Sequence, residues 1–275
     1  MTTAFVLSGG ASLGSIQVGM AQALFESGVE PDMVVGSSVG AINGSWLASA
    51  KPVDELARVW RSLRRSDLFP LSPLVGLRGF VGHRSHFVPN RGLRRMLERH
   101  VEFSMLEDAP VPFTVIATDA RSGEEVPLAQ GPTIPAVLAS AALPGVFPPV
   151  TINGRGLIDG GVVNNTPITH AIESGATEVW VLSTGYSCGL ANPPQAAIAM
   201  AMHSIALLVQ QRLVIETSRR DYPVPVHLIP PPCPISVTPI DFSQTDQLSD
   251  RAYVGTKQWL GNGRPHAMPL INHRH

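Results

Sequence analysis

The pentapeptide Gly36-Ser37-Ser38-Val39-Gly40 constrains the fold most strongly. It follows an apolar run, Met33–Val35, and precedes a helix-forming run, Ala41–Ala48. A G-x-S-x-G sequence between a strand and a helix is typical of a nucleophile elbow, a sharp turn that exposes its central serine. Backbone presses against backbone in such a turn, so we expect that only glycine fits at both ends. The alternative is an ordinary glycine-rich turn.

A similar unit precedes this one in the chain. Ala4–Leu7 has the pattern of a strand, Ser8–Gly14 that of a turn, and Ile16–Ser27 that of a helix with apolar residues at spacings of four and three. Gly28 is expected to end the helix. Two consecutive units of this kind place both turns at the carboxyl edge of a parallel sheet, where open α/β sheets bind ligands.

The first turn has three possible interpretations. A dinucleotide site needs G-x-G-x-x-G, but Ala11 stands at the middle glycine when the pattern is laid on Gly9 and Gly14. A phosphate-binding P-loop needs a lysine where Ser15 stands. The third interpretation, which we favour, is an oxyanion hole made by the backbone N–H groups of Gly10 and Ala11. Such donors are worth about 3 kcal/mol each in hydrolases.

A third turn carries a carboxylate. Leu157-Ile158-Asp159-Gly160-Gly161 predicts a short strand that ends in Asp-Gly-Gly. Taken alone, this sequence indicates a tight surface turn. Its neighbours, the segment 139–150 upstream and the segment 161–167 downstream, favour a functional role instead.

Together these segments resemble the patatin-like phospholipases, acyl hydrolases with a Ser-Asp dyad. The resemblance runs from Phe5 to about Arg212 and rests on the motifs above, which follow one another in the family's order. It implies an α/β fold, a three-layer α/β/α sandwich with a mostly parallel central sheet. It also implies that Ser38 is the nucleophile and Asp159 the base. The oxyanion hole then contains Gly9, Gly10 and Ala11, and the turns are shaped by Gly14, Gly36, Gly40, Gly160 and Gly161.

The first turn departs from the family pattern at two positions. Ala11 replaces the third glycine of the family's G-G-G-x-R/K-G, and Leu13 replaces its basic residue. Alanine keeps its N–H, so the donor survives if the backbone needs no positive φ there. Because the cation is missing, the resemblance supports no preference for an anionic headgroup.

The resemblance predicts a serine acyl ester hydrolase of lipid-like substrates, of phospholipase A, lysophospholipase or carboxylesterase type, that works without a cofactor. An exposed aspartate with a pKa near 3.9 is a poor base, so we expect burial to raise the pKa of Asp159. A transacylase on the same dyad and a noncatalytic lipid-binding or regulatory module remain alternatives.

Composition and spacing limit the other possibilities. The formal net charge of −1 gives no electrostatic case for nucleic acid, and none of the nine histidines has a metal-ligand spacing. Cys188 and Cys233 fall in separate predicted loops, so reduced thiols and a cytoplasmic location are expected, with no signal peptide before the first strand. We expect one hydrolase domain over 1–260 and a tail over 261–275 without periodicity. The oligomeric state stays open.

Two segments have no motif. Residues 65–90 are rich in proline, glycine and large apolar groups, which predicts a lid, an acyl-chain wall or a packed loop. Ala196–Val209 is apolar but shorter than the ~20 residues that span a bilayer. We favour a buried helix there, with an amphipathic interfacial helix as the alternative, and any membrane contact is expected to be peripheral.

Overall fold

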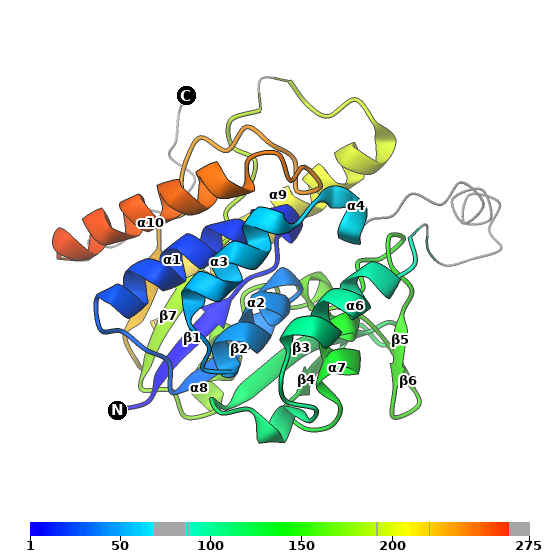
Figure 1. Cartoon of the computed structure of the whole chain (residues 1–275), viewed down its shortest axis with the longest axis horizontal. Coiled ribbons are helices and arrows are strands. Elements are labelled where there is room, and N and C mark those ends of the chain that lie inside the picture. The colour runs from blue at the N-terminus through cyan, green and yellow to red at the C-terminus, as the bar shows by residue number, and fades with distance from the viewer. Residues whose placement is uncertain (69–85, 87, 191, 220, 264–275) are drawn as a thin grey trace.

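The computed structural model describes residues 1–68, 86, 88–190, 192–219 and 221–263 (Figure 1). The strands are β1 (Thr3–Leu7), β2 (Met33–Ser37), β3 (Phe113–Asp119), β4 (Glu125–Leu128), β5 (Val150–Ile152), β6 (Arg155–Asp159), β7 (Glu178–Leu182) and β8 (Val226–Ile229). The α-helices are α1 (Ser15–Glu26), α2 (Val39–Ala48), α3 (Val53–Ser62), α4 (Arg65–Leu68), α6 (Arg91–His100), α7 (Thr133–Ser140), α8 (Ile168–Glu173), α9 (Ala197–Arg219) and α10 (Thr245–Gly261). Short 3-10 turns are η1 (Ala11–Gly14), η2 (Leu106–Asp108) and η3 (Gly160–Val162).

All of these strands belong to one mixed sheet with the order β5-β6-β3-β2-β1-β7-β8, and β4 pairs with β3. The five strands from β3 to β8 along that order are parallel, whereas β4, β5 and β6 pair antiparallel. The two expected strand–turn–helix units are present and adjacent, since Leu7 of β1 lies beside Gly36 of β2. Gly28 has φ +73° just after α1 and ends that helix, as expected.

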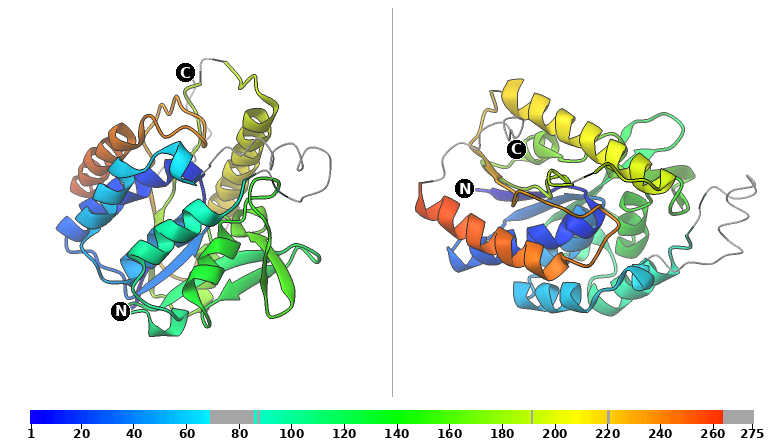
Figure 2. Two further views of the ribbon diagram at one scale, coloured as in Figure 1. Left: turned by 45° about the vertical axis from the view of Figure 1, so that its right-hand side comes forward. Right: turned by 90° about the horizontal axis from the view of Figure 1, so that it is seen from above.

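Helices cover both faces of the sheet, which makes three layers. Alternation along β1 sends Phe5 and Leu7 into a core with α1, α6, α7 and α10, and Ala4 and Val6 into a second core with α8 and α9. Figure 2 shows this from above, with α9 (yellow) on one side of the strands and α10 (orange) on the other. The predicted α/β/α architecture with a mostly parallel sheet is confirmed.

The sheet brings β2 and β6 end to end. On β3, residues 115–116 pair with both β2 and β4, and residues 117–118 pair with both β4 and β6. A strand has only two edges, so β2 and β6 share the edge of β3 that β4 does not occupy. Because β2 is parallel to β3 and β6 antiparallel, the carboxyl ends of β2 and β6 meet. Ser38 follows one of these ends and Asp159 is the other.

The structure corrects the prediction for the cysteines. Cys188 and Cys233 form a disulfide, with their Cα atoms 6.6 Å apart. The two cysteines are 45 residues apart in the sequence, far enough for one crossover between neighbouring strands. However, β7 and β8 are parallel neighbours, so the loops that follow their carboxyl ends lie side by side. The backbone N–H of Gly189 donates to the Ile235 carbonyl at 2.8 Å and joins the same two loops.

The preference for a buried helix over Ala196–Val209 was also wrong. The helix, α9, starts at Ala197 but continues to Arg219, and it lies on the surface (yellow in Figure 2, right). It exposes apolar side chains of Met200, Ile205, Leu207, Leu208 and Ile215. Among the described side chains of this helix, Leu213 packs into the core against the sheet, so an apolar composition alone did not decide burial. Among the described helices, none is long and apolar enough to cross a membrane.

Two other predictions fall on residues that the structure does not describe. The proposed lid or acyl-chain wall over 65–90 lies mostly in 69–85 and 87, and the tail lies mostly in 264–275. Val226–Ile229 forms β8, the edge strand of the sheet next to β7.

Candidate active site

The backbone at Ser38 is strained. Its φ of 55° and ψ of −123° lie in a region that non-glycine residues rarely adopt, which is the signature of an elbow between β2 and α2. A Cβ atom at Gly36 would collide with the Gly40 carbonyl, and a Cβ atom at Gly40 would collide with the Leu7 carbonyl. Both glycines are therefore required by close backbone approach, as the sequence predicted.

Ser38 and Asp159 are in direct contact. The Ser38 hydroxyl donates to Oδ2 of Asp159 at 2.6 Å, and the backbone N–H of Gly161 donates to Oδ1 at 2.8 Å. A Cβ atom at Gly160 would meet the Ile116 carbonyl and Ser37 Oγ, so glycine lets the Asp159 turn pack against the elbow. The carboxylate is thereby held by two donors and aimed at the serine.

Burial controls the acidity of Asp159. The residue is only 3% exposed. Removal from water raises the pKa of Asp159 to about 6, against the opposing effect of the hydrogen bonds from Ser38 and Gly161. The expectation that burial raises the pKa of Asp159 is confirmed. At neutral pH the group is mostly ionised but accepts a proton far more readily than an exposed aspartate.

The first turn lies beside this pair, and its donors differ in availability. The Gly9 N–H donates to the Asn165 carbonyl at 3.2 Å. The N–H groups of Gly10 and Ala11, in contrast, have no acceptor among the described residues. A Cβ atom at Gly9 would lie 2.9 Å from the Ser38 Cβ, so the turn touches the elbow. Of the three residues assigned to an oxyanion hole, two have a free donor and Gly9 supports the turn.

Ala11 adopts a positive φ, the conformation that would be unfavourable for an alanine at this position. Its φ is +50°, where an alanine side chain is disfavoured by about 1–2 kcal/mol. The N–H group survives the replacement of glycine, but at the cost of backbone strain. Leu13, which stands at the family's basic position, is buried, 1% exposed, in the main core and supplies no charge.

Two cavities meet at Ser38 and Asp159. The first is almost wholly apolar and extends between α2, α3 and α6. The second is wider and opens past the first turn toward α9, with Gly10, Gly161 and Asn165 in its wall. Ala11, Ser38, Leu143 and Asp159 line both. A molecule bound across the serine can therefore extend in two directions.

The comparisons with known proteins agree with this geometry. The model of the family "Patatin-like phospholipase" matches residues 5–172, which include the elbow and the Asp-Gly-Gly turn. The chain belongs to the patatin-like phospholipase family.

Relatives in sequence and structure are consistent with this family. An NTE family protein of Mycobacterium tuberculosis is 33% identical over 166 residues, 60% of this chain and 44% of that protein. Patatin-like phospholipase domain-containing protein 6 of Homo sapiens is 32% identical over 189 residues, 67% of this chain and 13% of that protein. The chain thus spans less than half the length of these relatives. The crystal structure of VipD from Legionella pneumophila shares the fold, with a TM-score of 0.56, 15% identity, and coverage of 95% of this chain and 67% of that one.

Several residues that support this patatin-like site were missed by sequence reasoning. Ser140 accepts from the Ser38 N–H at 2.9 Å and donates to the Ile116 carbonyl at 2.6 Å. The Thr118 hydroxyl donates to the Asp159 carbonyl at 2.8 Å, and the Thr184 hydroxyl donates to the Gly9 carbonyl at 2.7 Å. Ser140 lies in a segment on which the resemblance rests. However, the identity of a serine or threonine does not predict which backbone group its hydroxyl will bind. Thr184 lies beyond the part matched by the family model.

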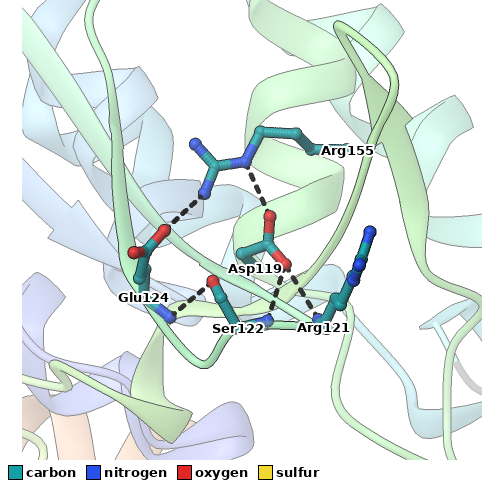
Figure 3. Close-up of polar contacts among 5 residues, drawn as sticks. All are labelled: Asp119, Arg121, Ser122, Glu124 and Arg155. Atoms are coloured by element: carbon teal, nitrogen blue, oxygen red, sulfur yellow. Dashed lines mark hydrogen bonds and ion pairs between the residues drawn. The ribbon is translucent and has the colours of Figure 1, made fainter.

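An ion pair fixes the start of the strand that carries Asp159. Arg155 Nε donates to Asp119 Oδ2 at 2.6 Å, and Arg155 also contacts Glu124 at 3.2 Å (Figure 3). The backbone N–H groups of Arg121 and Ser122 donate to the other Asp119 oxygen. The hydrogen bond from Arg155 and those from the backbone lower the pKa of Asp119 to about 2. β6 is therefore tied to the end of β3 by a charged group at any pH near neutrality.

Histidine and metal chemistry find no support in the part of the chain that the structure describes. No described histidine lines either cavity. His170 lies near Glu125, and His227 pairs with Glu178 at 2.9 Å at the far side of the sheet. Within the same residues there is no group of three or more His, Cys, Asp or Glu side chains that could hold a metal ion.

Proposed function

We propose that this patatin-like protein is a serine acyl ester hydrolase of lipid-like substrates, with its catalytic groups in one domain over residues 1–260. The observation that carries the proposal is the 2.6 Å contact between Ser38 Oγ and a buried carboxylate of raised pKa. A carboxylate in that position can take the serine proton as the hydroxyl attacks an acyl carbon.

The reaction has two halves. Ser38 Oγ bonds to the acyl carbon while its proton passes to Asp159, and the carbonyl oxygen becomes an oxyanion. Collapse of this intermediate breaks the ester bond, and Asp159 returns the proton to the departing alcohol. Water then attacks the acyl-enzyme with Asp159 as the base, and the carboxylic acid leaves as Ser38 regains its proton.

The oxyanion is stabilised by the free N–H groups of Gly10 and Ala11. The Ser38 N–H is not available, because it donates to Ser140 Oγ. Preorganised donors in a site that excludes water lower the barrier by about 3 kcal/mol each. The turn that holds them is fixed by Thr184 and Asn165, so little reorganisation is needed when charge develops.

Two observations favour lipid-like esters as substrates: the apolar side chains of the site and the names of the relatives. Most side chains around Ser38 are apolar, which favours substrates with hydrocarbon chains. A relative from Mycosarcoma maydis, named lysophospholipase NTE1, is 29% identical over 194 residues, 67% of this chain and 10% of that protein. The name of that relative describes hydrolysis of a lipid ester, and we propose the same type of reaction for this chain.

Catalysis is tested with 4-nitrophenyl octanoate and with lysophosphatidylcholine. The wild type is expected to hydrolyse both, and Ser38→Ala and Asp159→Asn are each expected to lose at least a thousandfold in kcat. If Asp159→Asn keeps substantial activity while Ser38→Ala does not, Asp159 is not the base. If an added alcohol takes the acyl group in preference to water at millimolar concentration, the protein is a transacylase instead.

A peripheral contact with the lipid surface follows from the position of α9. Leu208 on α9 and Val162 in η3 line the wider cavity, and they are 71% and 53% exposed. Leu207, the neighbour of Leu208 in the chain, is also exposed. Residues 197–211 contain no Asp, Glu, Lys or Arg. An exposed apolar rim at the mouth of a lipid site fits the surface of a neutral lipid aggregate, with burial of apolar area and not charge as the driving force.

Sedimentation with phosphatidylcholine vesicles tests this contact. The double variant Leu207→Ser/Leu208→Ser is expected to bind at least fivefold more weakly than the wild type, with little dependence on salt between 50 and 500 mM (roughly the range over which exposed charges become screened). Val254 on α10, which is 49% exposed and outside both cavities, provides the control Val254→Ser. Equal binding of the double variant and the control would exclude α9 as the contact.

A further inference from the structure

The narrow cavity between α2, α3 and α6 has the properties of an acyl-chain site. Apart from Ser38 and Asp159 at its mouth, every described residue that lines it is apolar or aromatic. The wider cavity carries Asn165 and the backbone of Gly9, Gly10 and Gly161. A glycerol or phosphate group would lose its hydration without compensation in the first cavity, so the polar part of an ester belongs in the second.

One wall of the narrow cavity, formed by Trp60, is held in place by hydrogen bonds and ring stacking. The Trp60 indole N–H donates to Asn43 Oδ1 at 2.8 Å, and Asn43 in turn donates to Gln17 and to the Gly14 carbonyl. The Trp60 ring also stacks on Phe242, with centroids 6.4 Å apart and planes 16° apart. A wall fixed in this way selects its ligand by shape, because it cannot widen without breaking buried hydrogen bonds.

The cavity extends along α2. Val39, Ile42 and Trp46 line it at helical spacings of three and four along α2, which begins just after Ser38. At 1.5 Å of rise per residue, the distance along the helix is about 6 Å from Ser38 to Ile42 and about 12 Å from Ser38 to Trp46.

We propose that this cavity binds the acyl chain of the substrate, over a length of about ten carbons, while the alcohol part lies in the wider cavity toward α9. The inference rests on the proposed ester hydrolysis at Ser38. The length follows from carbon–carbon bonds of about 1.5 Å at about 111°, which advance a chain by about 1.25 Å per carbon. Ile42 then lies beside about the fifth carbon and determines whether longer chains pass.

The test compares matched variants in the two cavities. With 4-nitrophenyl esters from acetate to palmitate, kcat/KM of the wild type is expected to rise at least tenfold up to about decanoate and then to rise no further. Ile42→Phe is expected to lower the ratio of decanoate to acetate activity at least tenfold. Leu208→Phe, which adds bulk to the wider cavity, is expected to change that ratio less than twofold and instead to alter the preference between methyl octanoate and an octanoyl lysophospholipid.

A smaller side chain provides the reverse test if Ile42→Phe does not fold. Ile42→Ala widens the cavity beside the fifth carbon, so it is expected to raise the activity on 4-nitrophenyl 4-phenylbutanoate relative to octanoate at least fivefold. If Leu208→Phe changes the acyl-length profile and the Ile42 variants do not, the chain lies in the wider cavity and the assignment is wrong. Activity that needs Ser38 but shows no such profile overturns only this inference, whereas no hydrolysis at any length overturns the proposed function as well.

Discussion

The buried carboxylate of Asp159 should destabilise the folded protein at neutral pH. Asn has the same shape as Asp, and its carbonyl can still accept from the Gly161 N–H while its amide donates to Ser38 Oγ. However, Asn carries no charge that has to be removed from water. We therefore expect Asp159→Asn to be more stable than the wild type above pH 6, although the variant is inactive.

The size of the effect follows from the pKa values of Asp159 in the folded and the unfolded protein. The pKa of Asp159 is about 6 in the folded protein and 3.8 in the ordinary, unfolded state. Because the folded protein holds this proton more tightly, protonation favours folding. That contribution is complete below pH 3.8 and is lost as the pH rises through about 6. The pKa difference of about 2 units corresponds to about 3 kcal/mol at pH 8. At pH 4.5 it corresponds to about 1 kcal/mol, because the folded state is still almost fully protonated while the unfolded state is mostly ionised.

Urea unfolding at pH 4.5 and pH 8 measures the difference. The free energy of unfolding of Asp159→Asn is expected to exceed that of the wild type by about 1 kcal/mol at the lower pH and by about 3 kcal/mol at the higher pH. Asp119→Asn is the control with the opposite sign, since the pKa of Asp119 is lowered to about 2 and its charge binds Arg155. That variant should be less stable than the wild type at both pH values. The reasoning would be refuted if the stability gain of Asp159→Asn over the wild type were no larger at pH 8 than at pH 4.5.

Three other predictions concern the elbow and the first turn. Ala11→Gly removes the strain of a positive φ and is expected to raise the free energy of unfolding by about 1 kcal/mol, whereas a loss of stability would show that the alanine side chain is needed for packing. The kcat/KM for an ester with a neutral alcohol is expected to rise about tenfold per pH unit below pH 6 and to level off above it, because the free enzyme needs ionised Asp159; a limb centred near pH 4 contradicts a buried base. Ser140→Ala removes the hydrogen-bond partner of the Ser38 N–H and of the Ile116 carbonyl. We expect the free energy of urea unfolding to fall by about 2 kcal/mol and kcat to fall with KM little changed. An unchanged kcat would mean that Ser140 does not position the elbow.

Local sequence predicted the elements of the site well. The two strand–turn–helix units were recognisable because glycines at Gly36 and Gly40 stand where backbone meets backbone, a steric need that few other structures share. Parallel neighbours then place their turns together by geometry alone. The contact between Ser38 and Asp159 also needs β6 to run antiparallel against β3, which was not predicted. The expectation that Ser38 and Asp159 act together came only from the resemblance to the family.

The failures have a common physical cause, which is tertiary context. The disulfide between Cys188 and Cys233 depends on β7 and β8 being neighbours, and no local pattern expresses that. α9 is apolar on nearly every side, so its periodicity could not show which stripe would meet the sheet. The positive φ of Ala11 likewise depends on the path of the whole turn between β1 and α1.

The most direct test of the dyad is the labelling of the protein by a fluorophosphonate, followed by mass spectrometry. We predict one adduct per chain, located on Ser38, with none formed in Ser38→Ala. Asp159→Asn should be labelled at least a hundredfold more slowly at pH 8, because the hydroxyl has lost its base. An adduct on another residue, or labelling of Asp159→Asn at the rate of the wild type, would contradict a Ser38–Asp159 mechanism.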